Sequence, residues 1–123
     1  MRISRHLIIL STCLVVTSAA WAQDFKVTLL GTGSPWPTIE RFGAATLVEA
    51  GNEKLLFDVG RGATIRLTQI GVSIGALNAV FLTHFHSDHT SGMPDLWLTG
   101  WIGRYYGNRQ SPFRVIGPKG TVS

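Results

Sequence analysis

Three of the four histidines in this 123-residue chain stand within six residues of one another, together with an aspartate. They are His84, His86, Asp88 and His89, in the order H-x-H-x-D-H, directly after the apolar run AVFLT at 79–83. Neutral imidazole nitrogens and carboxylates are good ligands for first-row metal ions, zinc above all. If the chain is still extended at His84, then His84 and His86 share one face and can bind one ion. Asp88 and His89 follow the bend and can turn toward a second ion.

The alternative interpretation is a polar loop whose histidines cap the following helix or face the solvent. A single histidine would favour that interpretation, but four ligand-type residues at this spacing favour metal binding. From the chain's own residue frequencies, the pattern arises by chance on the order of once in 10⁴ such chains. A glycine at Gly92 would help the backbone to turn away from the site. We therefore expect a metal site in this loop.

Short apolar runs separated by turn residues predict an α/β fold around the histidine loop. The loop follows the carboxyl end of a strand expected to be buried on both faces, which is where α/β sheets commonly bind ligands. A long loop over 31–43 carries three glycines and two prolines. Trp97 and Trp101 are expected in the core, although a tryptophan at a cleft rim could stack on a substrate ring. The predicted strands are 25–31, 45–51, 54–60, 79–83 and 113–117, and the predicted helices are 63–71 and 93–101.

The N-terminus predicts a secretory signal peptide over residues 1–22. Arg2 and Arg5 precede an uncharged, mostly apolar run, and Ala20-Trp21-Ala22 supplies an A-x-A cleavage site. The run is short for a bilayer span, so we expect no stable membrane anchor. Cleavage would remove Cys13, the only cysteine, and would leave the mature chain without disulfides or thiolate metal ligands. We expect a periplasmic or secreted protein.

Loss of the signal peptide would take two arginines from a formal net charge of +4 and leave +2. So small a charge gives no case for a nucleic-acid-binding surface. A mature chain of about 100 residues can close one small core but not a large two-sheet enzyme. The sequence stops in GPKGTVS, after a turn signal and before any closing element. Residues 23–123 are therefore expected to be the N-terminal part of a larger domain.

The motif and its neighbouring segments resemble one known superfamily. THFHSDH at 83–89 resembles the signature of the metallo-β-lactamase superfamily. LGTGSPWP at 30–37, LLFDVGRG at 55–62 and PDLWLTGW at 94–101 resemble its ribonuclease Z and arylsulfatase-like branch. A β-lactamase is a third possibility within the superfamily, but GTGSP and PDLWLTGW point away from it. The resemblance implies the αββα metallo-β-lactamase sandwich, an α/β fold of which this chain would hold the N-terminal half.

The resemblance also implies two zinc ions in the complete domain. His84 and His86 would belong to the first ion, and Asp88 and His89 to the second. The family completes both sites with two further histidines and a bridging aspartate from later in the chain, whereas no histidine follows His89 here. The chain would thus hold half of a two-metal site and is expected to be inactive by itself.

Three residues outside the motif have candidate roles. Asp58, in LLFDVG, could orient a ligand histidine and raise its basicity. It could equally cap the helix that is expected to begin near Gly62. Thr32 and Ser34 could line the substrate cleft, although a plain surface loop is at least as well supported for either of them.

The function implied is that of an exported zinc-dependent hydrolase of small-molecule esters, either aryl sulfates or phosphodiesters. Two metal ions about 3.5–4 Å apart lower the pKa of a shared water toward about 7 and supply hydroxide. By resemblance, Asp88 would also accept a proton during the reaction.

Three further possibilities concern the substrate, the activity and the assembly. One is a ribonuclease Z-type endonuclease that processes tRNA 3′ ends, but the signal peptide argues against it, because tRNA precursors stay in the cytosol. Another is a catalytically inactive metal-binding fragment. A homodimer is possible for the complete protein.

Overall fold

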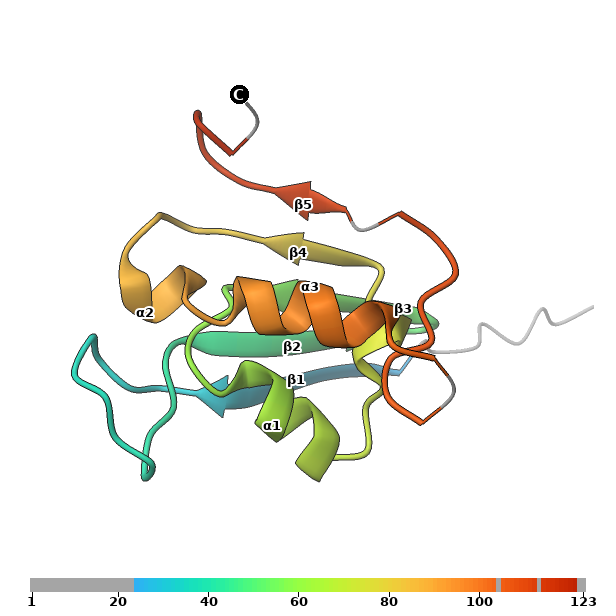
Figure 1. Ribbon diagram of the computed structural model, residues 1–123, viewed down its shortest axis with the longest axis horizontal. Helices are drawn as coiled ribbons and strands as arrows, with labels where there is room; N and C mark the ends of the chain where they lie inside the picture. Colours follow the sequence, from blue (N-terminus) through green and yellow to red (C-terminus); the bar gives the residue numbers. More distant parts are fainter. Residues whose placement is uncertain (1–23, 104, 113, 122–123) are drawn as a thin grey trace, which may run out of the picture.

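In the described part of the chain, five strands form one mixed sheet in the order β1-β2-β3-β4-β5 (Figure 1). The computed structural model describes residues 24–103, 105–112 and 114–121, so the predicted signal peptide lies outside the described residues. None of the described helices is long and apolar enough to cross a membrane. The elements are β1 (Phe25–Gly31), β2 (Ala45–Ala50), β3 (Glu53–Phe57), α1 (Ala63–Gln69), the 3₁₀ helix η1 (Ile74–Ala76), β4 (Ala79–Phe81), α2 (Ser87–Thr90), α3 (Met93–Trp101) and β5 (Val115–Ile116).

The predicted strands and helices are all present, but four strands are shorter than predicted, the one over 45–51 by a single residue. The expected strand over 54–60 ends at Phe57 because Asp58 adopts a left-handed φ of 60°. The strand expected to extend to 83 ends at Phe81, and after Leu82, whose N–H still donates to the Ile116 carbonyl at 2.8 Å, the chain enters the motif loop. Among the described residues of the run expected over 113–117, Val115 and Ile116 pair with β4. The one-turn helix α2, inside the motif, was not predicted.

The sheet changes from antiparallel to parallel pairing at β3. β1, β2 and β3 are antiparallel neighbours, whereas β3, β4 and β5 run parallel. Parallel neighbours need a crossover; α1 and η1 provide the first, and α2 and α3 the second. The carboxyl ends of β3 and β4 therefore lie at the same sheet edge, where Phe57 pairs with Phe81. This places Asp58 beside the first residues of the motif loop.

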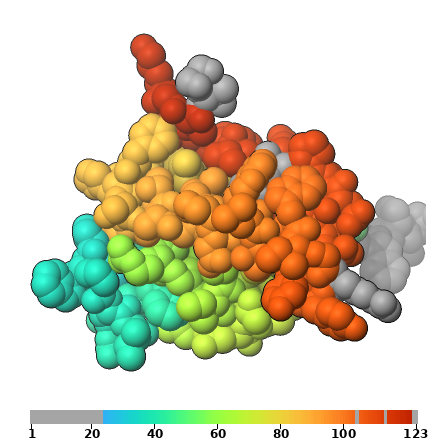
Figure 2. Space-filling model, viewed as in Figure 1, coloured from blue at the N-terminus to red at the C-terminus, as the bar shows by residue number. Residues whose placement is uncertain are grey.

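One face of the sheet is covered by helices and forms the core. Leu47, Leu56 and Val80 occupy one register row across β2, β3 and β4, and none of them is exposed to solvent. Leu67 of α1 and Leu96 of α3 belong to the same buried cluster. Figure 1 shows both helices in front of the sheet, and in Figure 2 their atoms cover much of it in this view. This row joins the strands that carry the motif to the helices that flank it.

The opposite face of the sheet is also apolar, but no described helix covers it. The rings of Phe57 and Phe81 stack there with centroids 4.8 Å apart, while Phe25 is 70% exposed and Leu29 is 67% exposed. Parallel strands normally bury both faces. An uncovered apolar face fits an α/β sandwich that needs a second layer. The register assigns this face to Phe25, Val27, Leu29, Val48, Leu55, Phe57, Phe81 and Ile116.

The expectation that the two tryptophans of α3 lie in the core is wrong. Trp97 is 44% exposed and Trp101 is 42% exposed, and their rings meet edge to face with centroids 6.1 Å apart. Leu96 and Gly100 are buried instead. Each tryptophan directly follows one of these two buried residues. One residue turns the side chain by about 100° around the helix, and therefore away from the sheet.

Two neighbouring leucines on β3 allow the contributions of the two sheet faces to stability to be compared. Leu56→Ala should lower the free energy of unfolding by about 2–5 kcal/mol, because Leu56 is fully buried beneath the helices. Leu55→Ala, on the uncovered face, should cost only about 1 kcal/mol, because its half-buried side chain gains less from folding. Urea unfolding followed by circular dichroism gives both values. Equal losses would contradict the assignment of the core to the helix side.

Candidate metal centre

The segment after β3 holds the backbone of the motif loop at both ends. Asp58 N–H donates to the Phe81 carbonyl at 2.7 Å, where β4 ends. Val59 N–H donates to the His89 carbonyl at 2.7 Å, and the Val59 carbonyl accepts from Gly92 N–H at 2.9 Å. Asp58 can take its left-handed conformation because aspartate tolerates that region better than most residues. The motif is thus attached to the sheet edge before any side chain is considered.

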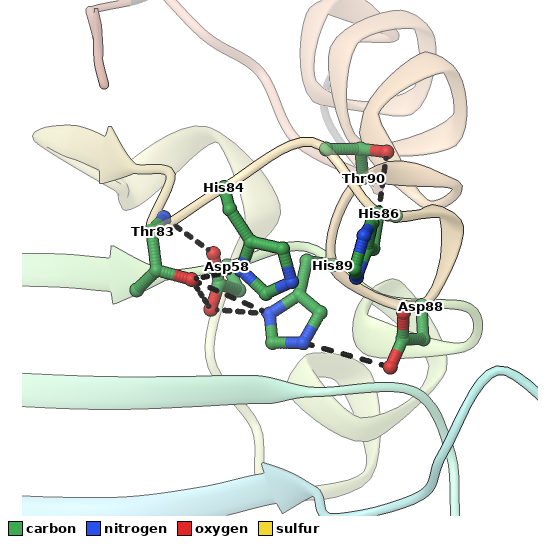
Figure 3. A network of polar contacts seen from close by, with 7 residues as sticks. All are labelled: Asp58, Thr83, His84, His86, Asp88, His89 and Thr90. Atoms are coloured by element: carbon green, nitrogen blue, oxygen red, sulfur yellow. Dashed lines mark hydrogen bonds and ion pairs between the residues drawn. The ribbon is translucent and has the colours of Figure 1, made fainter. Parts of the chain in front are cut away.

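The Asp58 carboxylate makes three hydrogen bonds to the motif loop (Figure 3). Oδ1 accepts from Thr83 N–H at 2.8 Å, and Oδ2 accepts from the Thr83 hydroxyl at 2.8 Å. Oδ2 also lies 2.7 Å from Nδ1 of His89. The helix-cap interpretation of Asp58 is wrong, because Gly62 is the N-cap of α1 and no side chain bonds there. The carboxylate contacts a motif histidine instead.

Two opposing effects act on the pKa of Asp58, which is 6% exposed. Burial raises the pKa, but the hydrogen bonds from Thr83 N–H, His89 and the Thr83 hydroxyl lower it. The bonds outweigh burial, so the pKa of Asp58 lies below its ordinary value. The group is therefore a carboxylate at neutral pH and can only accept hydrogen bonds.

The four motif residues lie close together on one side of the loop (Figure 3). The rings of His84 and His86 meet edge to face with centroids 4.6 Å apart, and the His84 and His89 centroids are 4.0 Å apart. His89 Nε2 lies 3.5 Å from Asp88 Oδ2. His86 occupies the N-cap position of α2, but its side chain makes no capping hydrogen bond. A capping role for this histidine, the plainer interpretation of the motif, therefore has no support in the geometry.

The pair formed by His89 and Asp88 has the chemistry of a cation site. The Asp58 carboxylate requires a proton on His89 Nδ1, so a neutral His89 ring presents the lone pair of Nε2 toward Asp88. A lone pair and a carboxylate oxygen repel one another unless a proton or a metal ion lies between them. Two ligands that are each about 2.1 Å from a tetrahedral zinc lie about 3.4 Å apart, close to the 3.5 Å observed here.

Asp88 gives a second indication that the site binds a cation. The residue is 6% exposed, and its Oδ1 is buried with no hydrogen-bond partner among the described residues. A buried carboxylate oxygen without a partner is costly unless it binds a cation. Within the described residues, no three His, Cys, Asp or Glu side chains are placed so that they would hold a metal ion by themselves. The residues present fit zinc as partial ligand sets, as the family resemblance implies.

Glycines allow three chain segments to close around the backbone of Asp88. A Cβ on Gly60 would lie 2.3 Å from the Asp88 carbonyl oxygen and 2.3 Å from the carbonyl carbon of Gly43. A Cβ on Gly43 would lie 2.7 Å from the same Asp88 oxygen, and one on Gly92 would lie 2.5 Å from the Gly60 carbonyl oxygen. The sequence suggested a turning role for Gly92 but gave no role to Gly43 or Gly60.

No hydrogen bond among the described residues joins Thr32 or Ser34 to the motif. Both residues are exposed, and Thr32 lines a hollow between β1, the following loop and α1, which no motif residue borders. Their place in a substrate cleft stays a prediction. Thr83, by contrast, contacts Asp58 and His84 although the sequence analysis gave it no role. A hydroxyl residue directly before the first motif histidine was the available signal.

Comparisons with known proteins found one matching family model and a set of similar curated proteins. The family model described as "Anti-Pycsar protein Apyc1" matches residues 25–114. Ribonuclease Z of Mycobacterium sp. (strain KMS) is 46% identical over 97 residues, which are 79% of this chain and 33% of that protein. This chain therefore spans about a third of the length of the curated relatives it matches.

Two solved structures are also similar to this chain. The short form of human tRNase Z is 33% identical with a TM-score of 0.63, over 76% of this chain and 34% of that one. The metallo-beta-lactamase fold protein YhfI from Bacillus subtilis is 25% identical with a TM-score of 0.67, over 79% of this chain and 37% of that one.

The packing of Gly60 against Asp88 can be tested with one methyl group. Gly60→Ala should lower the free energy of unfolding by about 1–3 kcal/mol, because the atoms that it meets are backbone atoms that cannot move aside. Gly103→Ala is the matched control, since a Cβ there has no atom within 4 Å. Thermal and urea unfolding measure both variants. A Gly60→Ala variant as stable as the control would contradict the close packing.

Proposed function

The chain belongs to the family of the anti-Pycsar protein Apyc1 and to the ribonuclease Z-like branch of the metallo-β-lactamase superfamily, and on this basis we propose that it is part of a zinc-dependent phosphodiester hydrolase. The observation that carries the proposal is the pair of His89 Nε2 and Asp88 Oδ2, 3.5 Å apart. Asp58 fixes the histidine from behind at 2.7 Å. A neutral imidazole and a carboxylate held in this way are ready to bind a cation.

A phosphodiester substrate is better supported than the aryl sulfate considered first. The curated relative named above is a ribonuclease Z at 46% identity, and the solved human relative is a tRNase Z at 33% identity. Both names refer to cleavage of RNA, whose backbone is a phosphodiester. None of the relatives named above is a sulfatase. The ribonuclease Z-type function, held as an alternative on the sequence alone, is therefore the stronger hypothesis, and nucleic acid becomes a candidate substrate.

Each motif residue has a distinct task in this proposal. His84 and His86 would bind one zinc ion, and Asp88 and His89 would bind the other. Bound zinc supplies a Lewis acid and makes hydroxide available at neutral pH. Asp58 keeps the His89 proton on Nδ1 and so leaves Nε2 free. Asp88, whose Oδ1 has no hydrogen-bond partner among the described residues, can both bind a cation and accept a proton.

The number of bound zinc ions should differ between the complete protein and this chain. We propose two zinc ions in the complete domain. The 123-residue chain alone should hold no more than one ion well and show no turnover, because the motif offers two ligands per ion and a catalytic zinc usually takes three. Calorimetric zinc titration of this chain checks the proposal. Two tightly bound ions per chain would refute this account of the ligands.

Export is a further proposal, based on Arg2, Arg5 and the Ala20-Trp21-Ala22 cleavage site. Mass spectrometry of the protein recovered from the cells that express it should find an N-terminus at Gln23. Export and tRNA 3′ processing exclude one another, because an exported enzyme would act on phosphodiesters outside the cytosol. An intact Met1 in a soluble cytosolic pool would refute export and would make tRNA precursors accessible.

The catalytic proposal predicts a metal-dependent phosphodiesterase. The complete protein should hydrolyse bis(p-nitrophenyl) phosphate, lose that activity to a strong chelator, and regain it with Zn²⁺. Asp88→Ala should lower kcat by at least about 10²-fold, because both a ligand and a proton acceptor are lost. Asp24→Ala, which removes an exposed carboxylate far along the chain from the motif, is the control and should leave kcat unchanged. Hydrolysis that persists in the chelator would overturn the metal mechanism, and faster cleavage of p-nitrophenyl sulfate would restore the sulfatase hypothesis.

A further inference from the structure

The Thr83 hydroxyl lies between the Asp58 carboxylate and the first motif histidine (Figure 3). Its Oγ1 is 2.8 Å from Asp58 Oδ2 and 3.0 Å from His84 Nδ1. Asp58 Oδ1 also holds the Thr83 backbone N–H at 2.8 Å, so one carboxylate fixes both the backbone and the side chain of this threonine. The hydroxyl is therefore placed to connect Asp58 with His84.

The direction of each hydrogen bond follows from counting protons. A carboxylate only accepts, so the single hydroxyl proton of Thr83 goes to Asp58. The Thr83 oxygen can then only accept from His84, which requires the His84 proton to be on Nδ1. The separation of 3.5 Å between Thr83 Oγ1 and His89 Nδ1 does not compete, because Nδ1 already donates to Asp58 at 2.7 Å.

We propose that Thr83 is a positioning residue through which Asp58 sets the tautomer of His84, while Asp58 sets the tautomer of His89 directly. Both rings then carry their proton on Nδ1 and present Nε2 as a lone pair. One carboxylate thereby prepares one histidine of each half of the proposed two-metal site. The relevance of this arrangement to zinc rests on the proposed function, whereas the hydrogen-bond geometry does not.

The tautomer matters because an imidazole can bind a metal ion only through the nitrogen that lacks a proton. A neutral imidazole with no fixed partner favours the form protonated on Nε2, and that form blocks the nitrogen that His84 would use. The Thr83 hydroxyl favours the tautomer protonated on Nδ1 already in the absence of a metal ion. Hydrogen-bonding partners behind a ligand histidine typically contribute 10–100-fold to metal affinity.

Two variants of Thr83 separate the hydroxyl from the space that it fills. Thr83→Val keeps the shape of the side chain but removes the hydroxyl, and Thr83→Ser keeps the hydroxyl. Two-bond ¹H–¹⁵N NMR of the imidazoles in the metal-free chain, at pH above the ordinary histidine range, reports each tautomer. Backbone ¹H–¹⁵N spectra show whether each variant folds, and zinc titration measures affinity.

The expected result is a change confined to one ring. Thr83→Val should move the His84 proton to Nε2 and leave His89 protonated on Nδ1, and zinc affinity should fall about 10–100-fold. Thr83→Ser should restore both the tautomer and the affinity. An unchanged His84 tautomer in a folded Thr83→Val variant would overturn the proposal, as would a loss of affinity that serine does not restore. Predicted tautomers in a wild-type chain that binds no zinc would support the relay and count against the proposed function alone.

Discussion

The hydrogen bonds of Asp58 are the interaction on which the candidate site depends. The carboxylate bonds to the backbone and hydroxyl of Thr83 and to the ring of His89. Its backbone N–H bonds to the end of β4, and the next residue, Val59, bonds to both His89 and Gly92. Without these contacts the motif would be a polar loop with no fixed direction. With them, two histidines present the same ring nitrogen to one side of the loop.

This anchor depends on the sheet around it. β3 and β4 run parallel and end in register at Phe57 and Phe81, so the residue after β3 lies beside the loop that leaves β4. Asp58 then takes a left-handed conformation at the strand end. Aspartate tolerates such a conformation, which costs about 1–3 kcal/mol where the surrounding structure holds it in place. The buried row of leucines and valine across the sheet supplies that support.

Strong local patterns made most of the fold and the motif predictable. Short apolar runs bounded by turn residues identified the strands, because these signals act within a few residues. The functions of Gly60, Gly43 and Thr83 were not predicted, since each depends on a contact with a residue far along the chain, which is Asp88 for the two glycines and Asp58 for Thr83. The prediction that Trp97 lies in the core failed because composition alone does not say which face of a helix packs against a sheet. The two hypotheses for Asp58 could be separated only when the partner of its carboxylate was known.

The most direct measurement of this account is an anomalous-diffraction structure of the complete protein crystallised with zinc. We predict anomalous peaks bonded to His89 Nε2 and Asp88 on one side and to His84 Nε2 and a ring nitrogen of His86 on the other. Asp58 should stay unbonded to metal, with its carboxylate still about 2.7 Å from His89 Nδ1. Zinc bonded directly to Asp58, or bonded to His89 through Nδ1, would contradict the account.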